Sequence, residues 1–228
     1  MRNIVEVREL RYVYEDGTEA LKKIDFELEA GETVALLGAN GSGKTTFALH
    51  LNGILRATSG SVVIDGIAMS DKTLAEIRRR VGLVFQDSDN QLFMPTVLED
   101  VAFGPLASGK SPEEAAEKAN AALTQVGMAH KAGKAPWHLS AGEKKRVAIA
   151  GILAGDPKLL VLDEPTTFLD PPGQRGLADL LESLPQAKLL ITHDVPFAQR
   201  LTERGVFFEA GAIAAKDRIP AIVEKFGW

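Results

Sequence analysis

The sequence predicts an α/β protein built on a mostly parallel sheet, with a second, antiparallel sheet beside it. In the last third of the chain, short apolar segments alternate with amphipathic helical ones, as in "KLLVLDEP" followed by "PGQRGLADLLESL". This pattern is typical of parallel strands joined by helical crossovers. The first third instead alternates apolar and polar residues at a period of two, which predicts antiparallel strands.

The antiparallel strands are expected at the beginning of the chain. "NIVEVRELRYVYEDGTEALKKIDFELEAGE" predicts a hairpin that turns at Asp16-Gly17, and "SGSVVIDGIAMS" predicts another that turns at Asp65-Gly66. Between them, "TVALLGANGSGKTTFALHLNGIL" predicts a buried strand, a glycine-rich turn and a helix. "KTLAEIRRRVGLVFQ" predicts a charged helix and then a buried strand that ends near Phe85.

A helical block is expected to interrupt the α/β pattern. From about residue 87 to residue 155 the apolar period changes to 3.6, which predicts a helical subdomain inserted into a single domain of 228 residues. One helix carries its own start signal, with Ser111 as N-cap and Glu114 closing a capping box. After the block the α/β pattern resumes. The end of the chain predicts a hairpin that turns at Ala210-Gly211, and a short final helix.

Composition limits the classes of function. The chain has 26 Lys and Arg against 31 Asp and Glu, a net charge of −5 that gives no electrostatic reason to expect a nucleic-acid partner. It contains no cysteine, which excludes disulfides and thiolate chemistry. The beginning, "MRNIVEVREL", lacks the layout of a signal peptide, and no apolar run approaches the ~20 residues that cross a bilayer. Any role at a membrane is therefore expected to require a partner.

The segment "GANGSGKT" predicts a phosphate-binding loop. It fits the pattern G-x-x-x-x-G-K-[ST] and lies between a predicted strand and a predicted helix, the context that the motif requires. The glycines allow backbone N–H groups to converge on phosphate oxygens, and a lysine adds positive charge. The hydroxyl of Thr45 suits one Mg²⁺ position, and Thr46 can bond a phosphate. The predicted nucleotide-binding residues here are Gly38, Ala39, Asn40, Gly41, Ser42, Gly43, Lys44, Thr45 and Thr46.

Two acidic residues end a later apolar strand, "LLVLDEPTT". Ligands of α/β folds bind at the carboxyl ends of the strands. Mg²⁺ on a triphosphate needs a carboxylate nearby, and Asp163 is the candidate. Glu164 follows it and is the candidate base for an attacking water, which implies hydrolysis. The alternative is that both acids cap the helix that follows Pro165.

Two further polar residues are predicted to complete the site from neighbouring strand ends. "LLITHD" places His193 where it could hold the γ-phosphate and the attacking water in line. "VGLVFQD" places Gln86 where its amide could reach both Mg²⁺ and water. Taken singly, each could equally be an ordinary surface or loop residue.

A second candidate phosphate-binding element is the segment "LSAGEKKRVAIAGIL". Ser140 and Glu143 predict a capping box at a helix start. A helix N-terminus that carries Ser and Gly is also suited to an anion. The basic residues that follow, Lys144, Lys145 and Arg146, are expected to form a solvent-exposed face.

Together these motifs resemble those of the ATP-binding-cassette ATPases. The resemblance rests on "GANGSGKT", "VFQD", "LSAGEKKRVAIAGIL", "LLVLDEPT", "TFLD" and "ITHD", in this order along essentially the whole chain. It implies a P-loop nucleotide-binding α/β core with an antiparallel β-subdomain and an inserted α-helical subdomain. It also implies ATP and Mg²⁺ as ligands, and hydrolysis of ATP.

The resemblance also implies a dimer. In this family two cassettes associate head to tail, and the signature loop, here residues 140–143, contacts the ATP held by the other chain. Ala141 and Glu143 depart from the usual Gly and Gln, and "TFLD" departs from the common S-A-L-D. The residues implied to act across the interface are Ser140, Ala141, Gly142, Glu143 and Asp170. Tyr14 resembles the aromatic residue that stacks on adenine, with Tyr12 as the alternative.

Within the family, "VGLVFQDSDNQLFMPTVLEDVAFGP" resembles the ATPase subunits of energy-coupling-factor importers of the cobalt and nickel type. This implies membrane partner subunits, one of which docks a cytoplasmic helix beside the segment after Gln86, and a location at the cytoplasmic face of the membrane. The apolar residues Leu92, Phe93 and Met94 could serve that docking or could belong to the core. The cargo, a metal ion or a vitamin, is not expected to contact this chain. The histidines outside the motifs show no metal-ligand spacing.

Three other classes of protein are less consistent with the sequence. A soluble cassette of DNA maintenance or translation is disfavoured by the single cassette, the acidic charge and the lack of a long coiled-coil insertion. A P-loop kinase or GTPase is disfavoured by "LSAGE" and His193. A non-hydrolysing regulatory cassette is disfavoured by Glu164.

Overall fold

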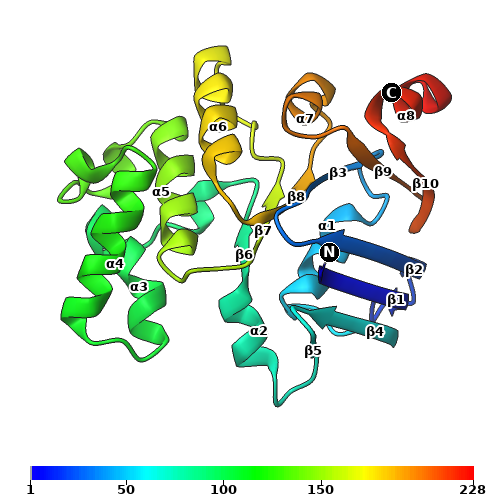
Figure 1. Cartoon of the computed structure of the whole chain (residues 1–228), viewed down its shortest axis with the longest axis horizontal. Helices are drawn as coiled ribbons and strands as arrows, with labels where there is room; N and C mark the ends of the chain where they lie inside the picture. The colour runs from blue at the N-terminus through cyan, green and yellow to red at the C-terminus, as the bar shows by residue number, and fades with distance from the viewer. Residues whose placement is uncertain (1) are drawn as a thin grey trace.

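A computed structural model of the protein describes residues 2–228 and arranges them around two sheets and a separate group of helices (Figure 1). The larger sheet has six strands, which are parallel except for the hairpin at one edge. Its order is β10 (Ala212–Arg218), β9 (Arg204–Glu209), β3 (Thr33–Leu37), β8 (Ala187–Ile191), β7 (Leu159–Asp163) and β6 (Val81–Val84). The predicted fold class is confirmed.

The smaller sheet is antiparallel and is formed by the first part of the chain. Its order is β2 (Glu19–Glu29), β1 (Asn3–Val13), β4 (Ser59–Ile64) and β5 (Ile67–Ala68). Both predicted hairpins are present. At the second, Asp65 and Gly66 have φ angles of 51° and 78°, the left-handed conformations that a tight two-residue turn requires and that Asp-Gly tolerates.

Two hydrophobic cores lie on opposite faces of the six-stranded sheet, because successive side chains of a strand point in opposite directions. Val34 and Leu36 of β3 belong to the core shared with the antiparallel sheet and with α1 (Lys44–Leu51). Ala35 and Leu37 belong to the core on the other face. The helices packed there are α6 (Pro171–Ser183), α7 (Val195–Leu201) and α8 (Ile219–Phe226).

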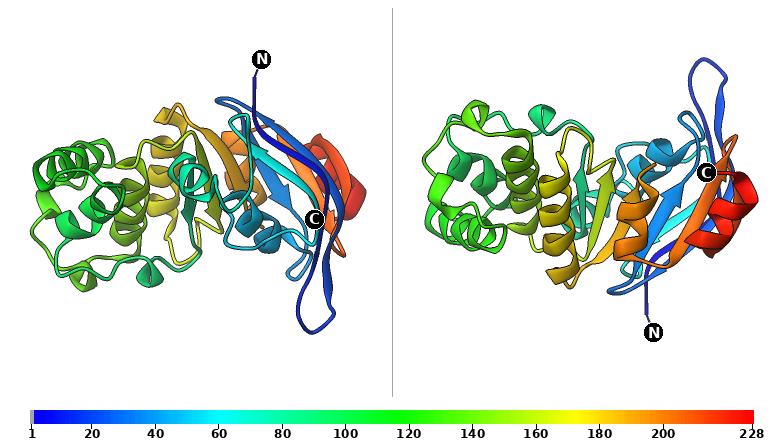
Figure 2. Two further views of the ribbon diagram at one scale, coloured as in Figure 1. Left: turned by 90° about the horizontal axis from the view of Figure 1, so that it is seen from below. Right: turned by 90° about the horizontal axis from the view of Figure 1, so that it is seen from above.

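The remaining long helices lie at the end of the molecule opposite the antiparallel sheet, as both views of Figure 2 show. We call α3 (Val97–Ala107), α4 (Pro112–Gln125) and α5 (Ala141–Leu153) the helical region. The capping boxes predicted for α4 and α5 are both formed. The short helix α2 (Leu74–Arg80) precedes β6, and single 3₁₀ turns span residues 88–90, 129–131 and 136–138.

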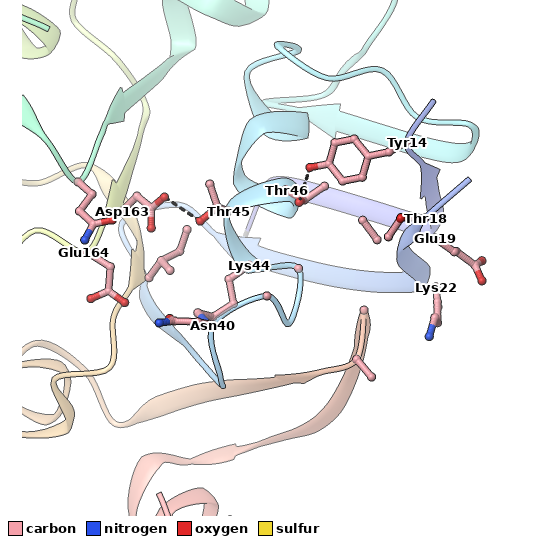
Figure 3. Close-up of a pocket in the computed structure, with 17 residues that line it drawn as sticks. Tyr14, Thr18, Glu19, Lys22, Asn40, Lys44, Thr45, Thr46, Asp163 and Glu164 are labelled. Atoms are coloured by element: carbon pink, nitrogen blue, oxygen red, sulfur yellow. Dashed lines mark hydrogen bonds between the residues drawn. The ribbon is translucent and has the colours of Figure 1, made fainter. Parts of the chain in front are cut away.

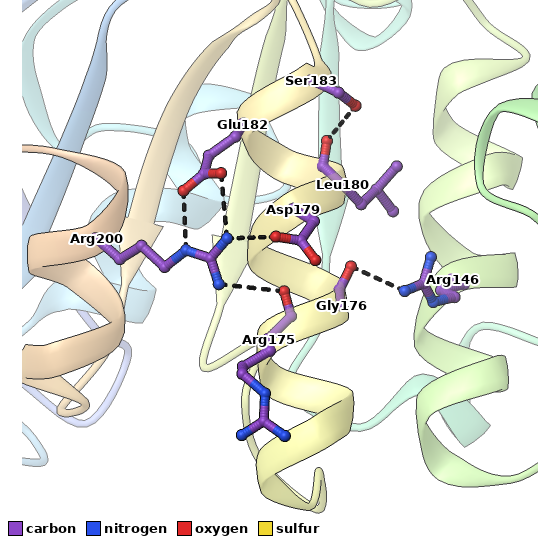
Figure 4. Close-up of polar contacts among 8 residues, drawn as sticks. All are labelled: Arg146, Arg175, Gly176, Asp179, Leu180, Glu182, Ser183 and Arg200. Atoms are coloured by element: carbon purple, nitrogen blue, oxygen red, sulfur yellow. Dashed lines mark hydrogen bonds and ion pairs between the residues drawn. The ribbon is translucent and has the colours of Figure 1, made fainter.

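Helix α6 is held from both sides by arginines (Figure 4). From the helical region, Arg146 donates hydrogen bonds to the carbonyl oxygens of Gly176 (2.8 Å) and Val126 (3.2 Å). From α7, Arg200 pairs with Asp179 and Glu182. These contacts fix the helical region and α7 relative to α6, which packs on the larger sheet.

The packing of α5 on β6 depends on a glycine. A Cβ placed on Gly82 would lie 1.8 Å from Cγ2 of Ile152, whereas a Cβ on Gly151, the neighbour of Ile152 in α5, would meet nothing within 4 Å. We therefore expect Gly82→Ala to lower the free energy of unfolding by about 1–3 kcal/mol through overpacking. Gly151→Ala should leave it unchanged or raise it by up to ~1 kcal/mol. Urea unfolding of both variants measures this.

A double variant checks the cause. Since the clash is with the Ile152 side chain, Ile152→Ala should cost less in the Gly82→Ala background than in the wild type. Simple additivity of the two changes would contradict this account.

Candidate nucleotide-hydrolysis site

The predicted phosphate loop joins β3 to α1 at the carboxyl edge of the larger sheet (Figure 3). Gly38, Gly41 and Gly43 have φ angles of 131°, 77° and 105°, a region that strains other residues. Two of them also lack room for a side chain. A Cβ on Gly38 would lie 2.2 Å from the carbonyl oxygen of Phe208, and one on Gly43 would lie 2.8 Å from that of Ala20.

Two polar side chains of the loop are buried. Nζ of Lys44 donates to the carbonyl oxygens of Gly38 (2.6 Å) and Ala39 (2.9 Å). Burial lowers the pKa of Lys44, and the nearby carboxylates of Glu164 and Asp163 oppose this effect. Ser42 is 5% exposed, and its hydroxyl has no hydrogen-bond partner within residues 2–228. Such an unsatisfied donor fits a loop that receives phosphate oxygens.

Asp163 connects the phosphate loop to the end of β7. Its Oδ2 accepts a hydrogen bond of 2.9 Å from the hydroxyl of Thr45 (Figure 3). Burial raises the pKa of Asp163, while the bond from Thr45 opposes the shift. Gln86 lines the same cleft. A carboxylate, a hydroxyl and an amide are oxygen donors of the kind that suits Mg²⁺.

Glu164 has a strained backbone and a histidine partner. Its φ is 44°, and its N–H donates to the carbonyl oxygen of Ile191 at the end of β8 (2.8 Å). Its Oε2 lies 2.8 Å from Nδ1 of His193 and accepts a longer bond, 3.4 Å, from the His193 backbone N–H. A left-handed glutamate persists only where the surroundings enforce it, and such residues gather at active sites.

Most of these groups line a cleft of 480 Å³, but Gly38, Ala39, Ser42 and His193 are not among its lining residues. Tyr14 lines it, with its hydroxyl 3.0 Å from that of Thr46, whereas Tyr12 packs against the core instead. The sequence did not indicate several other residues of the wall, because their types are not diagnostic of nucleotide binding. These are Thr18, Glu19, Ala20 and Lys22 of the first hairpin, Ile191 of β8, and the turn Ala210-Gly211.

The signature loop does not line this cleft. Ser140 is exposed and caps α5, accepting a hydrogen bond from the Glu143 N–H (3.3 Å). Asp170 likewise caps α6 through the N–H of Gly173 (2.8 Å). Both groups therefore lie outside the cleft that holds the phosphate loop of their own chain.

The charge of Glu143 has a partner that the sequence did not predict. Oε2 of Glu143 accepts the Ser140 N–H (2.9 Å), and Oε1 pairs with Nζ of Lys131 (2.9 Å). The Ser140 bond, and then Lys131, lower the pKa of Glu143. The glutamate in the signature loop is thus ionised and locally balanced. No motif pointed to Lys131, which lies in a short 3₁₀ turn before the loop.

The expectation that Lys144, Lys145 and Arg146 form a solvent-exposed face is wrong. Lys145 is 2% exposed, and Arg146 is partly buried. α5 packs against α3, α4 and α6 and also against β6, so that most of its circumference is covered. The predicted strand also stops at Val84 rather than Phe85. The backbone groups of Phe85 bond to the side chains of Gln91 and Lys145 instead of to a neighbouring strand.

Comparisons with known proteins agree with this geometry. A family model described as ABC transporter matches residues 21–167. The energy-coupling factor transporter ATP-binding protein EcfA of Methanosphaera stadtmanae is 55% identical over 200 residues, which cover 86% of this chain and 72% of that protein. EcfA of Methanocaldococcus jannaschii is 53% identical over 197 residues, which cover 84% of this chain and 71% of that protein.

Solved structures show the same fold. The structure of cbiO1 from Clostridium perfringens, described as part of the ABC transporter complex cbiONQ, has a TM-score of 0.89 at 37% identity and covers 99% of this chain and 92% of that one. A dimeric ATP-binding cassette in a post-hydrolysis state, bound to ADP and Pi, has a TM-score of 0.84 at 30% identity. The match covers 94% of this chain and 98% of that one. The chain therefore belongs to the ABC transporter family and is an ATP-binding cassette that couples ATP hydrolysis to transport.

Proposed function

We propose that this protein is the ATP-hydrolysing subunit of an energy-coupling-factor importer for cobalt or nickel ions, or for a vitamin. The similarity to EcfA and cbiO1 supports this transporter type. The observation that carries the proposal is an exposed aromatic pair formed by Phe103 of α3 and Phe93 of the segment before it. Phe93 and Phe103 are 64% and 43% exposed, and their rings meet edge to face with centroids 5.1 Å apart.

This pair borders a groove suited to a helix of a membrane partner. The groove is lined by residues 91–93 and by α3 and α5, where Gly104 and Gly151 contribute no side chains. Leu92 packs partly against the core, so only some of the apolar residues after Gln86 are available for docking. Clustered exposed aromatic residues mark interaction sites. No helix of residues 2–228 is long and apolar enough to cross a bilayer.

The groups of the cleft account for hydrolysis. The backbone N–H groups of the phosphate loop and Lys44 would hold the β- and γ-phosphates. Asp163, Thr45 and Gln86 would hold Mg²⁺, which when bound neutralises charge that develops on phosphate oxygens. Glu164, fixed by His193, would accept the proton of the attacking water, and His193 would also bond the γ-phosphate. Tyr14 would cover the adenine.

The signature loop would serve a second copy of the chain or a paralogue. In the proposed dimer, Ser140, Ala141, Gly142 and Glu143 contact the ATP of the other chain, and Asp170 contacts the other chain itself. Neither these residues nor Asp170 line the cleft of their own chain, and a dimeric cassette is found among similar structures; both observations support this arrangement. The protein would then lie at the cytoplasmic face of the membrane, held by its partners, and would not contact the cargo.

The membrane assignment is tested by isolating the protein from its source membranes in mild detergent and identifying the proteins that accompany it. We expect small multi-spanning proteins. Phe93→Ser with Phe103→Ser should lose them while ATP hydrolysis by the purified chain persists. Ile54→Ser, an exposed apolar residue (48%) outside the helical region, is the control. Co-isolation with ribosomes or DNA would overturn the proposal.

The role of Glu164 predicts a separation of binding from turnover. Glu164→Gln removes the base but keeps the size of the side chain, so hydrolysis should fall by about 10² or more. The Kd for ATP should change by no more than about threefold. Release of inorganic phosphate and titration with a fluorescent ATP analogue measure the two quantities. The control is Glu203→Gln, since Glu203 pairs with Arg218 on the surface. Undiminished hydrolysis by Glu164→Gln would exclude this role.

The pair Lys131–Glu143 predicts that a substitution of Glu143 reverses the effect of substituting Lys131. In Lys131→Gln the unbalanced carboxylate would face the phosphates of the other chain's ATP, and the KM for ATP should rise about threefold to tenfold, as expected for a charge interaction of about 1 kcal/mol. Glu143→Gln removes that charge, so the double variant should regain the KM of Glu143→Gln alone. If the changes in KM of the two single variants simply add in the double variant, the pairing is contradicted.

A further inference from the structure

The buried lysine of α5 connects two parts of the molecule that lie far apart in the sequence. Nζ of Lys145 donates hydrogen bonds to the carbonyl oxygens of Gln86 (2.8 Å) and Phe85 (3.1 Å), 59 and 60 residues earlier in the chain. Lys145 lies in the second turn of α5, directly after the signature loop. The lysine therefore attaches the signature helix to the backbone of a predicted catalytic residue.

The same backbone is held from its other side. The N–H of Phe85 donates to Oε1 of Gln91 (2.9 Å), and Nε2 of Gln91 donates to the carbonyl oxygen of Leu83 (3.0 Å). Beyond β6 the chain has no neighbouring strand to bond, and these two side chains take that place. Gln86 itself is exposed, so its position depends on its backbone rather than on packing of its side chain.

Lys145 is buried, at 2% exposure, so its ammonium group depends on the two carbonyl groups for its hydrogen bonds. A buried cation whose acceptors are removed loses its compensation, so the bonds to the two carbonyl groups resist opening. The neighbouring Lys144 differs, because it pairs with Asp89 at a more exposed position. Only Lys145 of the two contacts the Gln86 backbone.

We propose that Lys145 is a positioning residue that keeps the main chain of Gln86 attached to the signature helix, so that Gln86 and the signature loop move together. This inference rests on the proposed role of Gln86 at the nucleotide. When a partner displaces the helical region, Lys145 carries Gln86 into or out of the cleft. The connection consists of a buried cation and two carbonyl groups and does not require direct contact between Lys145 and ATP.

The test compares two buried lysines that make the same kind of contact. Lys188 of β8 is 5% exposed and donates to the carbonyl oxygens of Leu184 (2.6 Å) and Gln186 (2.9 Å), at the end of its strand remote from His193. Lys145→Met and Lys188→Met each remove one buried ammonium group and its two carbonyl bonds. The two substitutions should therefore lower the free energy of unfolding in urea by similar amounts, but they should differ in their effect on ATP hydrolysis.

Two measurements on the full chain distinguish the variants. For Lys145→Met we expect kcat for ATP hydrolysis to fall by about tenfold or more, with the KM for ATP within about threefold of wild type, because misplaced catalytic groups slow the chemical step. Backbone amides of residues 86–91 should exchange with deuterium faster. Lys188→Met should show neither effect. Lys145→Arg, which keeps the charge and the donors, should restore kcat to within about threefold.

Either of two results would overturn the inference. One is a kcat of Lys145→Met equal to that of Lys188→Met. The other is faster exchange at residues 86–91 with an unchanged kcat. If Lys145→Met does not fold, Lys145→Gln and Lys145→Arg decide, since the longer charged side chain should retain more activity than the neutral one. These measurements need no membrane partner, so the importer proposal can fail while this inference stands, and the reverse also holds.

Discussion

The hydrogen bond between Thr45 and Asp163 joins the two halves of the nucleotide site, and it depends on the same strand order that places the other polar groups of the site. It exists because β3, β8 and β7 are parallel neighbours, so that their carboxyl ends meet at one edge of the sheet. The phosphate loop follows β3, Asp163 ends β7, and His193 follows β8. A different strand order would scatter the same motifs over the surface.

The site also concentrates backbone strain. Glu164 and Phe168, within five residues, have φ angles of 44° and 67° although neither is a glycine. The Glu164 N–H is bonded to the end of β8, and Asp170 caps α6 just beyond, so the chain between them is fixed at both ends. This short connection leaves Phe168 75% exposed, on the side of the molecule near the signature loop. Strain of this kind is typical of functional loops.

Two basic side chains connect the helical region to the nucleotide core, and a third acts beside the signature loop. Arg146 bonds α5 to α6, Lys145 bonds it to the Gln86 loop, and Lys131 balances the carboxylate in the signature loop. Each joins charged or polar groups that would be costly to leave unpaired. An ATPase that transmits motion needs such connections between its parts, and here they lie within one turn of the signature loop or contact it.

The sequence by itself determined the fold class, the phosphate loop and the capping boxes of α4 and α5. These depend on local chemistry, namely the period of apolar residues, glycines in a left-handed turn, and a serine three residues before a glutamate. Only the tertiary structure decided that Lys145 is buried and that Lys131 neutralises Glu143. Each of these outcomes depends on which distant segments meet, and residue type alone does not specify the partner of a charged side chain. A lysine on a helix is exposed or buried according to what packs against it, and that is settled when the sheet and the helical region assemble.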